Sequence, residues 1–139
     1  MNLRTDVAGM LAVGILLLNT GCSEQAESEP PPGTIPAPAQ RDGITFAANI
    51  KPIFNGACVE CHGEKKQKAG LRLDSHEAAL KGGDEGAIFE AGKSADSRLI
   101  HSIARVGEED HWMPPIDNGK PLTLDQIALI RAWIDQGAN

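Results

Sequence analysis

The folded part of this chain has few of the large side chains from which small proteins build a core. Its 139 residues include three Phe, two Trp and no Tyr, so aromatic residues make up only 4% of the sequence. Apolar residues (41%) and charged residues (23%) are balanced as in a globular protein, which excludes a wholly disordered chain. A small domain that is poor in large rings has little with which to fill its interior. We therefore expect a group other than a side chain to help form the core.

Residues 1–21 are predicted to be a signal peptide. Arg4 precedes an apolar run at residues 7–18, which is too short to span a bilayer comfortably. The following residues end in Thr-Gly-Cys22 and resemble a bacterial lipobox, in which Cys22 becomes the lipidated first residue of the mature chain. Asn19 stands where the lipobox pattern prefers Leu. The alternatives are an ordinary cleaved signal and an uncleaved anchor; both kinds of cleaved signal imply export.

Residues 22–42 are predicted to be a disordered, Pro-rich tether. They hold five of the nine Pro residues, and Ile35 is their one large apolar side chain. Such a composition cannot bury enough surface to fold, and its prolines favour extended backbone. Ser23, directly after Cys22, resembles an outer-membrane sorting signal. Residues 43–139 remain as the expected folded unit.

Polar caps followed by apolar residues at helical spacing predict an all-α domain. Helices are expected after Thr45, Ser75, Ser94 and Thr123, whose hydroxyl groups can cap the first turn. The last pattern is the strongest, because a capping-box spacing precedes its apolar stripe. Pro52 falls inside the first helix and is expected to kink or divide it. Three or four helices with long irregular connections follow from these patterns.

Cys58, Cys61 and His62 form a Cys-x-x-Cys-His motif, which is the most specific short pattern in the chain. Two thiols at this spacing can each add across a vinyl group of haem, and the adjacent His then faces the iron as its proximal ligand. The motif therefore predicts one covalently bound haem c. A haem is also a large, flat, mostly apolar group of the kind that the core lacks.

Three other kinds of site use closely spaced cysteines. A redox dithiol is typical of a βαβ context, whereas this pair follows a predicted helix. A disulfide across two residues closes too small a loop to stabilise the fold much. A structural zinc site needs a fourth ligand. That ligand would have to be one of the remaining histidines, His76, His101 or His111.

Met113 is the leading candidate for the sixth iron ligand. It is the one Met after the signal peptide, and it lies in a loop outside any apolar stripe. Pro114 and Pro115 stiffen the backbone beside it, which suits a side chain that must keep one direction. A His/Met ligand pair favours electron transfer over oxygen chemistry. His111 is the main rival, and His76 and His101 are further ones.

Several segments together resemble the planctomycete-type cytochrome c domain. They are residues 49–54, 58–63, 69–75, 82–83, 92–100, 112–115 and 132–138. The resemblance covers about residues 44–138 and implies a class I cytochrome c-like fold, with His62 and Met113 as axial ligands. Residues 90–92 depart from it, because they read Glu-Ala-Gly where the family has Val-Pro-Gly.

The segment Gly-Leu-Arg-Leu-Asp-Ser at residues 70–75 also has a physical interpretation. Leu71 and Leu73 can pack against the macrocycle, and Arg72 or a nearby Lys can pair with a haem propionate. An Arg72 that is merely solvated is the equal alternative. Trp112 and Trp133 can contact the haem or donate to a propionate, although core packing is the simpler expectation for Trp133.

The leading functional hypothesis is an exported, membrane-tethered monohaem cytochrome that carries single electrons between redox partner proteins. It would lie on the periplasmic side of a bacterial membrane, lipid-anchored, with the outer membrane as one location. It would not be an enzyme, because no convincing catalytic set of residues is present. The net charge of −6 argues against nucleic acid and favours a partner with a basic docking face. The alternatives are a haem enzyme or sensor with a displaceable sixth ligand, and an accessory haem domain of a larger exported complex.

Overall fold

The computed structural model describes residues 29–139, and this part of the chain is helical and contains no strands. Its α-helices are α1 (Lys51–Ala57), α2 (His76–Lys81), α3 (Arg98–Ile103) and α4 (Leu124–Asp135). A π-helical turn, η1 (Phe46–Ile50), leads into α1. Short 3₁₀ turns punctuate the connections at η2 (Lys68–Gly70), η3 (Ser94–Asp96), η4 (Glu109–His111) and η5 (Ile116–Asn118). The all-α fold class is confirmed.

Three of the four predicted caps are present. Thr45 accepts a hydrogen bond from the Ala48 amide, Ser75 caps α2, and Thr123 begins α4 with a complete capping box. The third helix begins later than predicted. Its cap is Ser97, because Ser94 donates its amide and its hydroxyl to the carboxylate of Asp135 on α4 and forms only a 3₁₀ turn.

Pro52 divides the first helical segment as expected. The chain changes from the π-helical η1 to the α-helical α1 at Lys51, so Pro52 lies in the first turn of α1. A proline is tolerated there because the first amides of a helix have no intrahelical acceptor.

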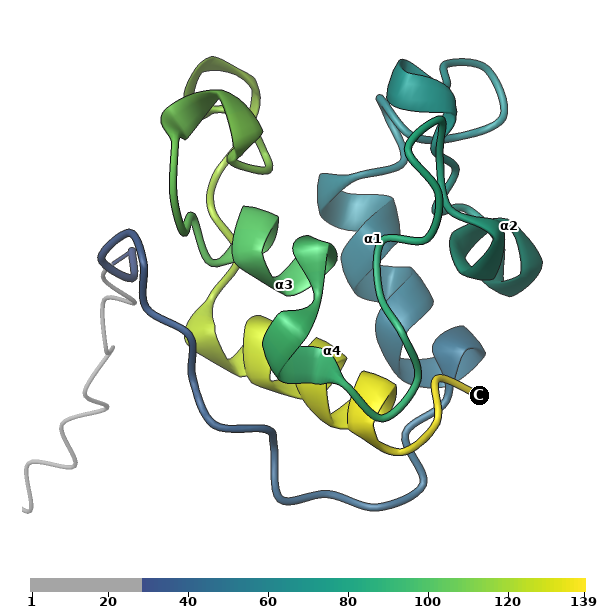
Figure 1. Cartoon of the computed structure of the whole chain (residues 1–139), viewed down its shortest axis with the longest axis vertical. Coiled ribbons are helices and arrows are strands. Elements are labelled where there is room, and N and C mark those ends of the chain that lie inside the picture. The colour runs from purple at the N-terminus through teal and green to yellow at the C-terminus, as the bar shows by residue number, and fades with distance from the viewer. Residues whose placement is uncertain (1–28) are drawn as a thin grey trace, which may run out of the picture.

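The aromatic residues gather on one side of the domain. Trp133 of α4 is fully buried, and the centroid of its ring lies 5.9 Å from that of Phe46 and 5.2 Å from that of Phe89. Phe46 also packs edge-on against Phe54 of α1, with centroids 6.0 Å apart. Four of the five rings thus fasten α4 to the segments around it, as expected for Trp133. α4 forms the base of the domain, beneath α1 and α3 (Figure 1).

Residues 33–41, which lie within the predicted tether, form an extended strap along this base. The Gly33 amide donates to the carbonyl of Ala104, and the Ala39 amide donates to that of Ala128, each at 2.9 Å. The side chain of Arg131 on α4 donates to the carbonyl of Pro36 in the strap. The side chain of Gln136, the C-cap of α4, donates to that of Arg41. Ile35 and Ala39 pack against the core. Extended backbone leaves carbonyls free to accept from α4, so the strap contacts the folded unit, and the division of the chain at residue 43 stays a prediction.

We expect Arg131→Met to loosen the strap. The substitution removes the donors to the Pro36 carbonyl and to the Ser94 hydroxyl while keeping a long apolar stem. Hydrogen bonds from a charged group contribute about 1.5–3 kcal/mol, so urea unfolding should show a stability loss of roughly that size. Lys81→Met, on the exposed end of α2, is the control and should change stability little. Equal effects of the two variants would contradict a structural role for the strap.

Among residues 29–139, no helix has both the length and the apolar character needed to cross a membrane. The predicted signal peptide at residues 1–21, the lipidation site Cys22 and the sorting residue Ser23 lie outside the described residues.

Candidate haem site

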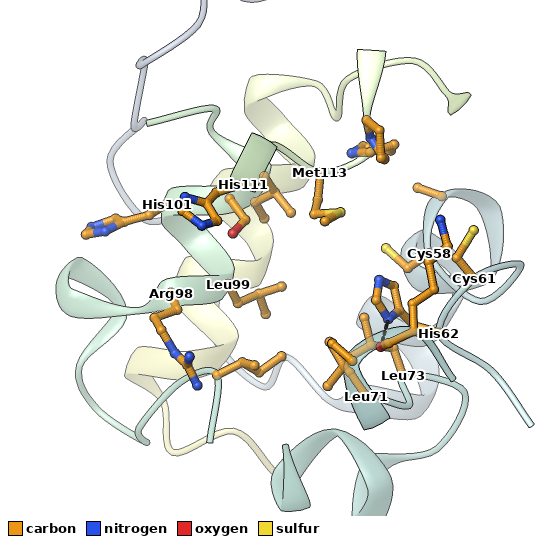
Figure 2. A pocket seen from close by; sticks show the side chains of 18 of the residues that line it. Cys58, Cys61, His62, Leu71, Leu73, Arg98, Leu99, His101, His111 and Met113 are labelled. Atoms are coloured by element: carbon orange, nitrogen blue, oxygen red, sulfur yellow. Dashed lines mark hydrogen bonds between the residues drawn. The ribbon is translucent and has the colours of Figure 1, made fainter. Parts of the chain in front are cut away.

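A cavity of about 580 Å³ opens between two lobes of the domain. One wall comes from the end of α1, the Cys-x-x-Cys-His motif and residues 68–73, and the other from α3 and the loop that follows it (Figures 1 and 2). The volume is within the range of pockets that hold one cofactor-sized ligand. None of the Phe or Trp side chains lines it. The cavity therefore has room for a large flat group that no aromatic side chain supplies. This agrees with the expectation that a group other than a side chain helps to form the core.

The first wall carries the complete motif. Cys58 ends α1, and a tight turn follows in which the amides of Cys61 and His62 donate to the Cys58 carbonyl at 3.1 and 2.9 Å. This turn brings both thiols and the imidazole to the cavity. Gly63 is needed next, because a Cβ there would lie 2.5 Å from the carbonyl oxygen of Val59. The local backbone therefore explains why the three functional residues and a glycine are adjacent.

His62 is oriented as a metal ligand through its Nε2. Its Nδ1 lies 3.1 Å from the carbonyl oxygen of Lys68, a contact that suits a protonated Nδ1 and leaves Nε2 unprotonated. Burial lowers the pKa of His62, and this outweighs the raising effect of hydrogen bonds with the backbone at Lys68 and Leu71. A neutral imidazole is the form that binds a metal.

The burial of Cys58 argues against a redox dithiol. Burial raises the pKa of the Cys58 thiol to about 12. A redox dithiol instead depends on a lowered thiol pKa. Both Cys58 and Cys61 are free rather than joined by a disulfide.

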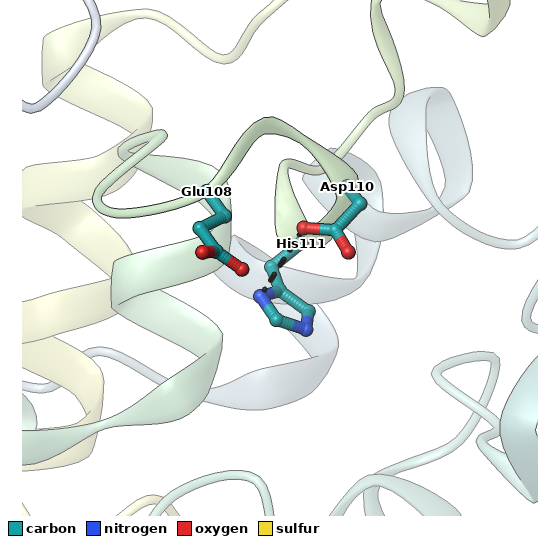
Figure 3. Close-up of side chains that lie close together, drawn as sticks. All are labelled: Glu108, Asp110 and His111. Carbon is teal, nitrogen blue, oxygen red and sulfur yellow. Dashed lines mark ion pairs between the residues drawn. The ribbon is translucent and has the colours of Figure 1, made fainter.

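No fourth ligand completes a zinc site at the motif. In the described residues, the one group of three Cys, His, Asp or Glu side chains close enough to share an ion is Glu108, Asp110 and His111 (Figure 3). All three are exposed, and Asp110 and His111 line the opposite wall of the cavity. The zinc alternative therefore lacks the geometry that it requires.

Met113 projects into the cavity from the second wall, across from His62 (Figure 2). Its amide donates to the carbonyl of Ser102 on α3 at 3.0 Å, which ties the loop to the helix at this residue. The sulfur and the imidazole thus approach one space from opposite sides, as two axial ligands of one iron must.

The three rival histidines differ in their surroundings. His76 does not line the cavity, because its ring stacks against Phe46 and its Nε2 lies 2.6 Å from the Ala138 carbonyl. His101 lines the cavity, but its Nε2 is 2.9 Å from the carbonyl of Ala95. His111 also lines it, and its side chain is 72% exposed. His111 is therefore the nearest competitor of Met113.

Of the cations near residues 70–75 that could pair with a haem propionate, Lys68 lines the cavity and Arg72 does not. Arg72 forms a two-pronged ion pair with Asp74, at 2.7 and 3.0 Å, and does not line the cavity. Leu71 and Leu73 do line it, as expected for residues that pack against a macrocycle. Sequence reasoning missed Arg98, a cationic residue of the cavity wall that is paired with Glu85 at 2.7 Å. Its position at the first turn of α3 gives no sequence signal for this role.

Together these residues fit a covalently attached haem. Two thiols stand on one side of the cavity, an imidazole and a thioether face each other across it, and the remaining walls are largely aliphatic (Figure 2). This combination of attachment and ligand groups defines the site of a c-type cytochrome domain.

Comparison with known proteins supports the resemblance seen in the sequence. Residues 58–117 match the family model described as planctomycete cytochrome C, a span that runs from the first motif cysteine past Met113. The match confirms that this part of the chain is similar to the planctomycete-type cytochrome c domain. The matched span is shorter than the region 44–138 over which the resemblance extends. No curated protein and no solved structure matches the chain.

Proposed function

We propose that the protein is an exported, membrane-tethered monohaem cytochrome that carries single electrons between redox partner proteins. The observation that carries this proposal is the arrangement of two thiols, His62 and Met113 around one apolar cavity. Cys58 and Cys61 would hold one haem c through thioether bonds, and His62 and Met113 would be its axial ligands. When bound, the haem supplies a one-electron ferric/ferrous couple.

The ligand set favours electron transfer over catalysis. An iron with both axial positions filled by protein side chains has no open position for a substrate, and a Met/His pair raises the reduction potential. The aliphatic walls formed by residues such as Leu99, Ile103 and Val106 keep the surroundings of the iron similar in its two oxidation states. Neither a general acid nor a nucleophile is needed for this reaction.

One observation favours a second function, that of a haem sensor or haem enzyme. Met113 lies on a loop of 3₁₀ turns between α3 and α4, and the exposed His111 lines the same cavity. A ligand on such a loop can be displaced more easily than one on a long helix. A haem sensor or enzyme would use a sixth position that opens in this way.

A visible spectrum with and without carbon monoxide distinguishes the two functions. The exported protein should show a c-type haem that acid acetone does not extract, and its reduced form should bind carbon monoxide slowly and weakly. Rapid, tight binding would instead favour a sensor or an enzyme. A protein without covalent haem would refute the proposal altogether.

The membrane tether is a further part of the proposal. Lipidation at Cys22 would anchor the chain on the periplasmic side of a bacterial membrane, with the outer membrane as the location that Ser23 suggests. The strap supports this arrangement, because it lies along α4 at the base of the domain, while the lobes that bound the cavity lie above α4 (Figure 1). A chain tethered through the strap would leave the cavity accessible to a partner.

We expect the redox partner to present a basic face. The exposed acids Glu60, Glu85 and Asp110 line the cavity, and Glu85 is the one of these that is paired with an arginine. The whole chain has a net charge of −6. Such a surface attracts cations and accelerates their association at low salt.

Small redox reagents of opposite charge provide the test. At low ionic strength, a cationic metal complex should exchange electrons with the protein faster than an anionic complex of similar potential, and added salt should reduce the difference. Asp110→Asn should lower the rate with the cation, whereas Asp125→Asn at the start of α4 should not. Faster reaction with the anion would contradict a basic partner.

A further inference from the structure

Arg105 ends α3 in a conformation that is usual for glycine. Its φ is +57°, and the two hydrogen bonds of a Schellman motif surround it: its own amide donates to Ser102, and the Val106 amide donates to His101. A residue with a Cβ is strained in this left-handed region, so the position normally favours Gly. The fold here accommodates a large charged side chain instead.

The side chain of Arg105 contacts both neighbours of Met113. Its guanidinium carbon lies 5.7 Å from the centroid of the Trp112 ring, within the range of a cation–π interaction. Its Nη2 lies 3.4 Å from the carbonyl oxygen of Pro114, and its Nε is buried. Arg105 itself does not line the cavity. Arg105 therefore contacts the loop outside the cavity, through Trp112 and Pro114.

Two further hydrogen bonds connect the loop around Met113 to the end of α3. The indole of Trp112 donates to the carbonyl of Gly107 at 3.2 Å, and the amide of Met113 donates to the carbonyl of Ser102 at 3.0 Å. The loop thus returns to the end of α3, where Arg105 fills the space between Trp112 and Pro114. One side chain thus contacts the ring of the residue before Met113 and the backbone of the residue after it.

We propose that Arg105 is a positioning residue for Met113 and keeps its thioether directed toward His62. This inference rests on the proposed function, in which Met113 is the sixth iron ligand. A planar guanidinium is required because it can cover the indole face and donate in its own plane at the same time. Lysine keeps the charge but has no planar group of this kind.

Two variants of the full-length, haem-loaded protein test the proposal. Arg105→Gly removes the side chain and also relieves the left-handed strain, so thermal stability should not fall by the full value of the lost contacts. Arg105→Lys preserves the charge near the haem, so its effects cannot come from a lost charge. In both variants we expect a roughly tenfold rise in the population with Met113 dissociated, equivalent to about 1.4 kcal/mol.

The readouts report the sixth ligand rather than the fold. The weak long-wavelength band of sulfur-ligated ferric haem should lose intensity, and carbon monoxide should bind the ferrous protein about ten times faster, because association follows the dissociated population. Arg41→Gln is the matched control, since Arg41 is an exposed arginine of the strap. It should change neither readout.

Met113→Ala, measured alongside, separates the two proposals. If this variant keeps the long-wavelength band, Met113 is not the ligand and the proposed function fails in that respect, whatever the Arg105 variants show. If Met113→Ala loses the band while Arg105→Lys keeps both the band and the wild-type rate of carbon monoxide binding, the role of Arg105 is overturned. Should Arg105→Gly fail to accumulate, Arg105→Lys alone decides.

Discussion

Replacing both Cys58 and Cys61 by Ala is expected to abolish covalent haem attachment. The two thiols lie on the same tight turn after α1 and both line the cavity, so no other cysteine of the described residues can take their place. Haem staining of the denatured, exported protein should fall to background. Any haem that remains with the folded protein should be extracted by acid acetone.

The same double variant is expected to lose much of its stability. The aliphatic residues Leu71, Ile88 and Val106 line the cavity and are only partly buried by the protein itself. Covering each of them with the macrocycle stabilises the fold by about 1 kcal/mol, as estimated from the apolar surface that is buried. A total of a few kcal/mol is a large part of the 5–15 kcal/mol that is typical of small domains. The unfolding midpoint and the helical circular dichroism signal should therefore fall together.

The third cysteine provides the control for this experiment. Cys22→Ser should retain covalent haem and the spectrum of the wild type, because its position lies outside the motif. It should also release the protein from membranes if Cys22 is lipidated. The single variants Cys58→Ala and Cys61→Ala should each keep one thioether bond. Covalent haem in the double variant would contradict the assignment of the motif.

Local sequence signals were sufficient where a helix is started by its own cap. Thr45, Ser75 and Thr123 each accept a hydrogen bond from an amide three residues later, and this spacing can be recognised in a sequence. Ser94 has the same local pattern but bonds to Asp135, 41 residues away, so the helix begins at Ser97 instead. A contact of that range is not encoded in any short pattern.

The strap also depends on contacts between residues that are far apart in the sequence. Its composition is that of a disordered linker, yet its carbonyls accept from Arg131 and Gln136, which lie 95 residues further along the chain. Composition describes what a segment can bury by itself, and it does not describe what a distant helix can donate to it.

The residues proposed to bind the haem could be predicted from the sequence, but the residues that support them could not. The motif residues and Met113 carry chemistry that is specific to their types, and the structure brings all of them to one cavity. Arg98 and Arg105 escaped notice because a cation gains its role from its neighbours in space. Of the cations proposed as partners of a propionate, Arg72 pairs with Asp74, whereas Lys68 lines the cavity.

Replacing Met113 by Ala is expected to have the largest effect on the properties of the iron. The substitution removes the one sulfur that faces His62 across the cavity (Figure 2). The long-wavelength band of the oxidised protein should disappear, and carbon monoxide should bind the reduced protein rapidly. Axial ligands tune haem potentials over about 0.8 V, and the loss of a Met ligand should lower the potential by on the order of 0.1 V or more. Redox titration followed in the visible spectrum measures this shift.

Variants of His111 complete the test, because His111 is the nearest competitor for the iron. His111→Ala alone should leave the band and the potential close to those of the wild type. If Met113→Ala remains six-coordinate and binds carbon monoxide slowly, His111 has replaced the sulfur, and the double variant of Met113 and His111 should then open the site. An unchanged band and potential in Met113→Ala would remove Met113 from the iron. Loss of the band in His111→Ala, with Met113 intact, would assign the sixth position to the histidine.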